Sequence, residues 1–442
     1  MLPFLFIGFL ALQKSGAALE EQAFNQLAAV QAIKAGEVEK FFAERRGDMG
    51  VLVETVATLR REAFNKLSAV QAIKKNQLEQ YFQRAAINLS LIARNPTTVQ
   101  AIAEFTDAFL AGGHKVGGTE WSAVEKRLGP VFTHLLKEDG YYDVFLISNA
   151  GDVVFSAVKE PDLGQNLVSG PLNNSGLGKA FRDSEKRKTA FADLAPYAPS
   201  NNQPAGFLAS SIVDGAGKRV GAVAIQILIN QINQIMQERT GLGKTGETYL
   251  VGPDKLMRSD SFLDPKNHTV EASFARPETG AVDTEASRAA LAGKTGMDVI
   301  SDYNGNPVLS VYGPVDTHGV RWARIAEIDV AEAFVPTDDT GGEFYKKYAK
   351  LYGYYDLFMI NPNGFVFYTA TREPDYQTNM VEGKFSASNL GRPCGMCCAR
   401  KALASRISHP MPPPTTTPRR LHRPADRPSG RGRGDHCLAD FP

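Results

Sequence analysis

A glycine-rich segment at residues 241–246 is the best match in this sequence to a nucleotide-binding motif. It reads GLGKTG and fits the GxGxxG pattern of dinucleotide-binding loops. Such a loop needs a β-strand before it and a helix after it, because the helix N-terminus holds the phosphates. Here a helical pattern precedes the glycines, and a strand-like segment follows them at 248–251. The order is reversed, so we interpret the glycines as a helix stop and a turn.

Residues that could catalyse a reaction or bind a metal do not form a recognisable set. There is no HExxH and no GxSxG motif, and the first cysteine is Cys394, so the body of the chain has no thiol nucleophile. The net charge of +1 gives no argument for a nucleic-acid partner. We therefore predict a chain that is not an enzyme and has no metal, no cofactor and no nucleic acid. The histidines before the last fifty residues are widely scattered and are His114, His134, His268 and His318.

Seven residues in two segments have side chains suited to a small ligand. Aromatic faces combined with a few polar groups are typical of small-molecule pockets. One segment opens a predicted strand, and the other lies on a predicted loop at 191–202 that leads to later strands. The alternative is purely structural, with tyrosines at a core edge and Pro-Ser-Asn forming turns. The predicted ligand-binding residues are Tyr141, Tyr142, Asp143, Asp193, Tyr197, Ser200 and Asn201.

Alternating hydrophobicity predicts two sets of strands that would position these residues. From about residue 141 the apolar period changes from 3.6 to 2, which indicates a change from helix to strand. Helices followed by meandering strands favour an α+β fold. The first set has two strands within 143–155, strands at 207–213 and 219–229, and a helix at 229–239. The second set has a strand at 248–251, a helix at 285–292, and strands at 297–303, 308–315 and 321–328.

Residues 13–112 are predicted to be helical and contain a 40-residue repeat. Residues 23–42 read AFNQLAAVQAIKAGEVEKFF, and residues 63–82 read AFNKLSAVQAIKKNQLEQYF. Forty residues are about 11 helical turns, so one continuous helix would present both copies on the same face. Two interpretations remain open: a hairpin broken near Gly47–Gly50, or a long stalk that pairs with another subunit to form a homodimer. The predicted apolar face carries Phe24, Leu27, Val30 and Ile33, then Phe64, Leu67, Val70 and Ile73.

The first twelve residues, MLPFLFIGFLAL, are apolar but fall short of the roughly 20 residues that span a bilayer. They are either the remnant of a transmembrane helix, which would anchor the protein in a membrane, or a buried or mis-started N-terminus.

Residues 342–392 repeat the start of the first strand set. GYYDVFLI at 140–147 returns as GYYDLFMI at 353–360, and Glu160-Pro161-Asp162 returns as Glu373-Pro374-Asp375. This predicts the truncated start of a second copy of the same α+β unit.

The tail, 393–442, is predicted to be disordered and out of frame. It is rich in Pro and Arg and nearly free of aromatic residues. One nucleotide sequence can encode PYAPSNN (196–202) in one frame and PMPPPTT (410–416) in the next. Residues 394–399 can likewise be encoded by a nucleotide sequence whose other reading frame gives a string similar to part of the first strand set. The same holds for residues 421–428, but there it requires a second frame shift between about 417 and 421. The alternative is a natural disordered tail.

Long strings in residues 13–335 resemble the double-Cache sensor of bacterial methyl-accepting chemotaxis proteins. These strings are GLGKTGETYLVGPDKLMRSDS (241–261), DYNGNPVLSVYGPV (302–315) and ARIAEIDVAEAF (323–334). The resemblance implies two PAS-like modules on a long helix, a membrane-distal one at 113–239 that usually holds a small-molecule ligand, and a membrane-proximal one at 240–335. It also implies a dimer at the inner membrane with its sensor region periplasmic.

The resemblance does not extend to every feature of that family. The Tyr/Arg/Trp/Tyr/Asp set of its amino-acid-binding members cannot be placed here, because neither Trp121 nor Trp322 lies in such a string. Coupling to a kinase would require a signalling half that this sequence does not contain. The same sensor also occurs on histidine kinases and cyclic-dinucleotide enzymes, and a stand-alone ligand-binding protein is the remaining alternative.

Overall fold

This computed structural model describes residues 2–337, 340–361 and 363–397. It divides into two compact units, and each is described by itself: one is residues 61–353, and the other combines residues 1–60 with residues 354–442. The predicted out-of-frame tail lies, from residue 398 onward, outside the described residues.

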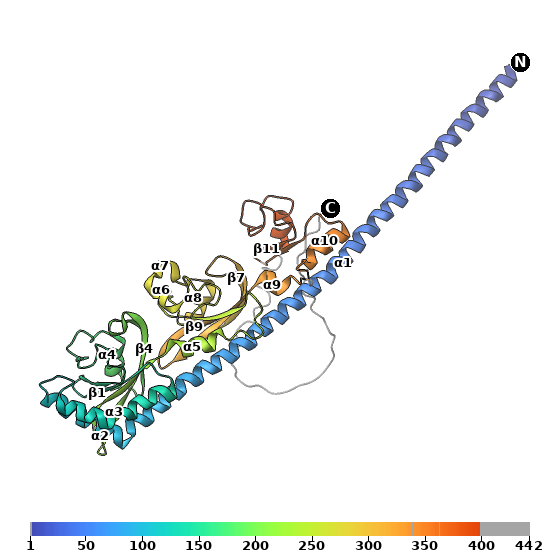
Figure 1. Ribbon diagram of the computed structural model, residues 1–442. Coiled ribbons are helices and arrows are strands. Elements are labelled where there is room, and N and C mark those ends of the chain that lie inside the picture. The colour runs from blue at the N-terminus through green and yellow to red at the C-terminus, as the bar shows by residue number, and fades with distance from the viewer. Residues whose placement is uncertain (1, 338–339, 362, 398–442) are drawn as a thin grey trace, which may run out of the picture. The chain divides into compact units, whose positions relative to one another are not determined.

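The first helix, α1 (Leu2–Arg94), runs without a break through Gly47 and Gly50 (Figure 1). The alternative of a hairpin broken there is wrong, and the predicted long N-terminal helix is confirmed. The segment is rich in Ala, Leu, Glu, Gln and Lys, whose helix propensity offsets a cost of about 1 kcal/mol for each interior glycine. α1 ends where Asn95 caps α2 (Pro96–Ala111) by accepting a hydrogen bond from the Thr97 amide at 2.9 Å.

The face that α1 buries within residues 61–94 differs from the predicted one. Phe64 and Leu67 are buried as expected, but Ile73 is 56% exposed, and Gln71 and Lys74 take the inward positions instead. In the first copy of the repeat, all four predicted face residues are exposed. The two copies therefore have the same sequence pattern but different surroundings.

Gln71 and Lys74 are buried because each has backbone partners. The Lys74 ammonium donates to the carbonyl oxygens of Ile235 and Glu238, at the C-terminal end of α5 (Ile229–Gln237). A cation is stabilised there by the unpaired carbonyls of the helix end. The Gln71 amide donates to the Val311 carbonyl at 2.8 Å. These bonds fix the register of α1 against the strands that it covers.

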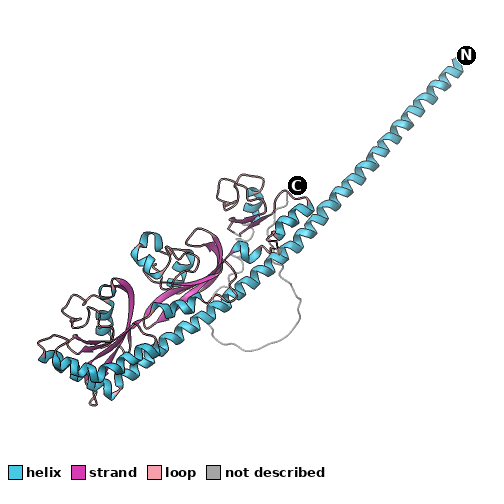
Figure 2. Cartoon of the chain, viewed as in Figure 1, coloured by secondary structure: helices cyan, strands magenta, loops and turns pink. Residues whose placement is uncertain are grey.

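Residues 96–227 form the five-stranded module, an antiparallel sheet in the order β2-β1-β5-β4-β3 with helices on both faces (Figure 2). Alternate residues of β1 face opposite sides: Val144 and Leu146 pack with α2 and α3 (Thr119–Asp139), whereas Phe145 and Ile147 pack with α4 (Gly176–Asp183). The strands are β1 (Asp143–Ser148), β2 (Val153–Ser156), β3 (Ala190–Tyr197), β4 (Gln203–Val213) and β5 (Arg219–Ile227).

Strand β3 was not expected, because its segment was predicted as a loop. It is an edge strand with Pro196 near its end, and a proline is tolerated only at an edge where its missing amide is not needed. Its register against β4 shifts between Ala192 and Ala195, which is a β-bulge at Asp193 and Leu194. Asp193 and Tyr197 therefore lie on a strand, and a short 3-10 turn, η1 (Ala198–Ser200), carries Ser200.

Residues 247–334 form the four-stranded module, a second antiparallel sheet in the order β6-β9-β8-β7. Helix α8 covers one face of this sheet, near the predicted helix 285–292. Its strands are β6 (Glu247–Val251), β7 (Gly296–Ser301), β8 (Pro307–Thr317) and β9 (Val320–Asp329). Its helices are α6 (Val270–Ala275), α7 (Pro277–Gly280), α8 (Glu285–Leu291) and α9 (Val330–Phe334), and α10 (Phe344–Tyr352) follows. The α+β class with two antiparallel modules is confirmed.

The hairpin of β10 (Phe358–Ile360) and β11 (Val366–Thr369) repeats the β1–β2 hairpin closely. Ile147 pairs with Val153 after a register shift, and Ile360 pairs with Val366 after the same shift. The equivalence of the two hairpins supports the prediction that a second sensor begins here.

Candidate functional site

Polar side chains from four segments meet on the α4 face of the five-stranded sheet. Asp143 and Gln226 are cross-strand partners on β1 and β5, in line with the residues that face α4. Tyr197, at the end of β3, belongs to the same packed cluster. The loop after β2 adds Glu160 and Asp162.

Hydrogen bonds join these side chains around two carboxylates. The Tyr142 hydroxyl donates to Glu160 at 2.7 Å, and the Ser200 hydroxyl donates to the other oxygen of Glu160 at 2.5 Å. The Tyr197 hydroxyl donates to Asp162 Oδ2 at 2.8 Å, and the Gln226 side-chain amide lies 3.4 Å from the Ser200 oxygen. We call this set the Glu160–Asp162 cluster; its members are Tyr142, Glu160, Asp162, Tyr197, Ser200 and Gln226.

Asp143 positions the loop that carries the two carboxylates. Its Oδ1 accepts hydrogen bonds from the backbone amides of Ala157 at 2.9 Å and Val158 at 3.1 Å, and its Oδ2 accepts from the Ser156 hydroxyl at 2.6 Å. Burial raises the pKa of Asp143 to about 6, although these bonds act in the opposite direction. Apart from a bond from the Val144 amide beside it, its bonds fix Ser156 and the start of this loop, so its role in the geometry is structural.

Asp162 and Gln226 each keep one acceptor atom without a partner. Within the described residues, Asp162 Oδ1 and Gln226 Oε1 are buried and accept no hydrogen bond. Burial, followed by the nearby Asp143 and Glu160 carboxylates, raises the pKa of Asp162 to about 7. Buried polar atoms are nearly always paired, so two orphan acceptors in one cluster need an explanation.

The structure brings three of the seven predicted residues into this cluster: Tyr142, Tyr197 and Ser200. Asp143 lies beside it, and Asn201 follows Ser200 in a left-handed conformation with an exposed side chain. Tyr141 packs on the opposite face with α2 and α3. It precedes the start of β1 at Asp143, so the alternation of the strand does not extend to it.

Asp193 lies in a different environment. Its carboxylate accepts from the Arg258 guanidinium at 2.9 and 3.0 Å and from the Trp322 indole at 2.9 Å. Arg258 and Trp322 belong to the four-stranded module, so this contact joins the two modules.

Sequence reasoning missed Glu160, Asp162 and Gln226 as site residues. The signal for two of them was present, since Glu160-Pro161-Asp162 recurs as Glu373-Pro374-Asp375, but it was used only to recognise the repeat. Gln226 stands in an apolar strand, and its sequence neighbours give no sign of its partners.

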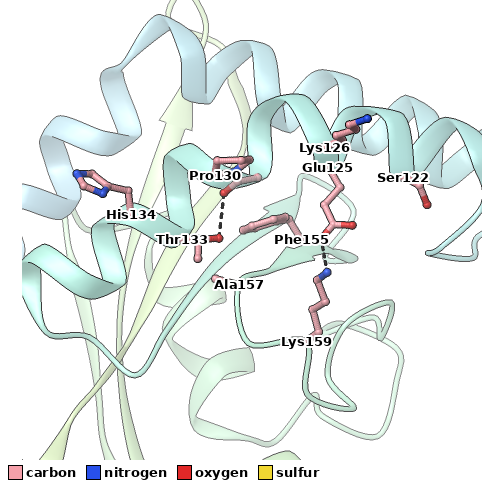
Figure 3. A pocket seen from close by; sticks show the side chains of 10 residues that line it. Ser122, Glu125, Lys126, Pro130, Thr133, His134, Phe155, Ala157 and Lys159 are labelled. Atoms are coloured by element: carbon pink, nitrogen blue, oxygen red, sulfur yellow. Dashed lines mark hydrogen bonds and ion pairs between the residues drawn. The ribbon is translucent and has the colours of Figure 1, made fainter.

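A separate groove of about 700 Å³ lies on the other face of the module, between α3 and the end of β2 (Figure 3). Its floor is Phe155 and Ala157, and an ion pair between Glu125 and Lys159 closes one side. Pro130 and Thr133 on α3 form part of the wall. In the groove Glu125 and Lys159 are paired with each other, Lys126 also lines it, and it shares no residue with the Glu160–Asp162 cluster.

The four-stranded module buries two neighbouring carboxyl groups, Glu247 and Glu327, which face each other across β6 and β9. Glu247 accepts from Tyr303, from Ser261 at 2.8 Å and from the Phe262 amide at 3.0 Å. Glu327 accepts from the Tyr249 hydroxyl at 2.7 Å. Burial raises the pKa of Glu327 to about 8, with Glu247 and Asp302 acting in the same direction. Burial therefore favours the protonated form of Glu327.

The stability of the chain should fall with rising pH because of Glu327. Between the ordinary value of 4.5 and about 8, the folded state keeps a proton that the unfolded state releases. Stability from this group is full below that window and is lost as pH rises through it, with a slope of roughly 1 kcal/mol per pH unit. Glu327→Gln, a neutral isostere, should remove this slope in urea unfolding across the window. Glu278→Gln, at an exposed position, is the matched control, and an equal slope in wild type and Glu327→Gln would contradict the prediction.

No group of three or more His, Cys, Asp or Glu residues within the described ranges is placed to hold a metal ion. The long helix and the two antiparallel α+β modules are the features of the described residues that a family comparison can test.

Residues 16–337 match a family model described as Cache domain, of the type dCache_1. The match covers well over half of the chain, and the chain belongs to this family of small-ligand sensor domains. No curated protein matches the chain with comparable significance.

Several solved structures are similar in fold at low sequence identity. The ligand-binding domain of the Pseudomonas fluorescens chemoreceptor CtaA, in complex with L-isoleucine, is 14% identical, covers 63% of this chain and 97% of its own, and has a TM-score of 0.42. The sensor domain of the V. cholerae histidine kinase DctB is 12% identical over 62% and 98% of the two chains, with a TM-score of 0.41. The ligand-binding domain of the Pseudomonas aeruginosa PAO1 amino acid chemoreceptor PctB, in complex with L-Gln, is 13% identical over 65% and 97%, with a TM-score of 0.38.

Proposed function

We propose that this chain is the extracytoplasmic sensor region of a bacterial transmembrane chemoreceptor and that it binds a small molecule at the Glu160–Asp162 cluster. The cluster is the observation that carries the proposal. It combines aromatic faces, hydroxyl groups and carboxylates at the meeting point of β1, β3, β5 and the loop after β2. Such a set of convergent polar groups is what a small-molecule site requires.

The arrangement also gives ligand binding a structural consequence. The loop at 157–162 is tied to β1 by the Asp143 carboxylate and by a bond from the Ala157 amide to the Val144 carbonyl, whereas Tyr197 and Ser200 belong to β3 and η1. A ligand held between the loop and the sheet would join these elements. The same β3 carries Asp193, which contacts the four-stranded module, so occupancy of the cluster has a direct route to that module.

The placement outside the inner membrane is part of the proposal and rests on family membership and on the sequence resemblance. No helix in the described part of the chain combines the length and hydropathy of a membrane span. In the proposal, the apolar residues 1–12 are the end of a membrane anchor, and coupling to a kinase depends on a signalling half outside this sequence.

Binding at the cluster should be lost when its hydroxyl groups are removed. A library of small metabolites would be screened by thermal shift on the full chain, and each compound that binds would be titrated against Tyr197→Phe and Ser200→Ala. We expect affinity to fall about 10-fold for each change, because each exchange removes a hydrogen bond that orients a carboxylate. The matched control is Thr133→Val in the groove beside α3. Compounds whose affinity changes only in the control would contradict the site.

Dimerisation through the helical stalk is a further part of the proposal. The predicted face of the first repeat, which includes Leu27 and Val30, is 54–66% exposed in the single chain. Sedimentation of the full chain should show a dimer that dissociates when Leu27 and Val30 are both replaced by Asp, because a charge in an apolar seam is costly. Asn25→Asp with Ala32→Asp puts the same charges on the opposite side of the helix and should leave the dimer intact. A monomer in the wild type at high concentration would contradict the stalk interpretation.

A further inference from the structure

We propose that the ligand of the Glu160–Asp162 cluster is a small organic cation that donates hydrogen bonds from an ammonium group to Asp162 and Gln226. This inference rests on the proposed function and names the chemical class that the site selects.

The charge of the site is the first observation. Three carboxylates, Asp143, Glu160 and Asp162, lie close together: Asp143 binds Ser156 at the start of the loop that carries the other two, and these bind Ser200 and Tyr197, three residues apart. Within the described residues, their side-chain oxygens are bonded only to hydroxyl groups and backbone amides, and no Lys, Arg or His side chain is among their partners. Neighbouring carboxylates that are largely removed from water repel each other, and a bound cation offsets this repulsion.

The two orphan atoms are the second and independent observation. Asp162 has no exposed surface and Gln226 is 5% exposed, yet Asp162 Oδ1 and Gln226 Oε1 have no donor. A carboxylate oxygen and an amide oxygen are both acceptors, so the missing partner must carry N–H or O–H donors. An ammonium group supplies up to three donors and a positive charge together.

An anionic ligand would find few donors here. The hydroxyl groups of Tyr142, Tyr197 and Ser200 already donate to Glu160 and Asp162. A ligand carboxylate would therefore add another negative charge to the set, and the Gln226 amide is the one side-chain group of the cluster with an N–H left to donate.

The second hairpin repeats the feature. Tyr355 donates to Glu373 as Tyr142 does to Glu160, and Asp356 accepts from the Ala370 and Thr371 amides as Asp143 does from its loop. Asp375 Oδ1, at the position equivalent to Asp162, is also buried without a partner. An unpartnered acceptor at the same place in both copies indicates a retained function of that atom.

Calorimetric titration of the full chain tests the inference with probes matched in size and opposite in charge. The cations are ethanolamine and putrescine, and the anions are glycolate and succinate. We expect at least one cation to bind and neither anion to bind. Asp162→Asn keeps the shape and removes the charge, and it should weaken cation binding by about 10-fold or more, whereas Asp107→Asn, at an exposed site on α2, should not. If Asp162→Asn does not fold, Gln226→Glu replaces it and should tighten cation binding.

The alternative outcomes separate this inference from the proposed function. If an anion binds and its affinity falls in Tyr197→Phe, the site is correct and the ligand class is wrong. If a cation binds equally well to wild type and to Asp162→Asn, the cation lies elsewhere and the inference is wrong. If neither cation binds at millimolar concentration, the inference is also wrong, and only the failure of every library compound would remove the proposed function with it.

Discussion

Replacing Asp193 with alanine should lower the free energy of unfolding of this protein by about 3 kcal/mol or more, because it leaves a buried charge without its main partner. The Arg258 side chain is only 2% exposed, and Asp193 receives two of its guanidinium nitrogens at 2.9 and 3.0 Å. Its remaining carboxylate partner, Asp254, is 43% exposed. The Trp322 indole would lose its acceptor in the same substitution.

Urea unfolding of the full chain measures this effect. Asp283→Ala is the control, because Asp283 pairs with Lys255 and Arg288 at the surface, where ion pairs contribute little. If Asp193→Ala shifts the transition no more than this control does, the buried pair does not hold the modules together as described.

The β-bulge explains why Asp193 can make this contact. Two residues of β3 stand opposite the single residue Gly206, and the extra residue turns side chains out of the regular alternation. Asp193 then reaches Arg258, and Leu194 packs into the core of the four-stranded module with Tyr249 and Ala323. Strand β3 thus belongs to one module and anchors the other.

Phe82→Ala should have a similarly large effect and lower the free energy of unfolding by about 3–5 kcal/mol. The substitution removes the ring that packs α1 against both modules. The Phe82 ring is 2% exposed, and its centroid lies 5.3 Å from that of Phe191 and 5.5 Å from that of Trp322. Phe191 and Trp322 are themselves in contact at 5.9 Å. Removal of one ring leaves a cavity that the rigid strands β3 and β9 cannot close.

The repeat in α1 supplies a matched control for this substitution. Phe42 ends the first copy as Phe82 ends the second, but Phe42 is 51% exposed. Measured at a concentration where the chain is monomeric, Phe42→Ala should change the unfolding transition by no more than about 0.5 kcal/mol. Equal losses in the two variants would contradict the account of how α1 packs on residues 61–353.

Periodicity was sufficient to predict the regular parts of the fold. The change from period 3.6 to period 2 near residue 141 located the strands of both modules, and the class was correct. Strand β3 was missed because its bulge and Pro196 break the alternation. The buried face of α1 was wrong at Ile73, since Lys74 gains backbone partners at the end of α5 that no local pattern reveals.

The candidate site was only partly predictable for a related reason. Tyr142, Tyr197 and Ser200 were selected by residue type, and they converge because the start of β1 and the end of β3 both lie beside the loop that carries Glu160 and Asp162. Their acceptors, Glu160 and Asp162, lie on a loop whose course depends on the bonds of Asp143. Asp193 was predicted to bind the ligand because of its residue type, but the bulge directs its carboxylate to Arg258 instead.

Hydrogen–deuterium exchange of the full chain, with and without the small molecule that binds most tightly, tests the central claim most directly. Binding at the Glu160–Asp162 cluster should slow exchange in the loop 157–163 and in residues 197–203, because the ligand ties both segments to the sheet. Exchange in α3 around residues 122–134, which line the separate groove, should stay unchanged. Protection confined to 122–134, or no protection in either segment of the cluster, would contradict the assignment of the ligand site.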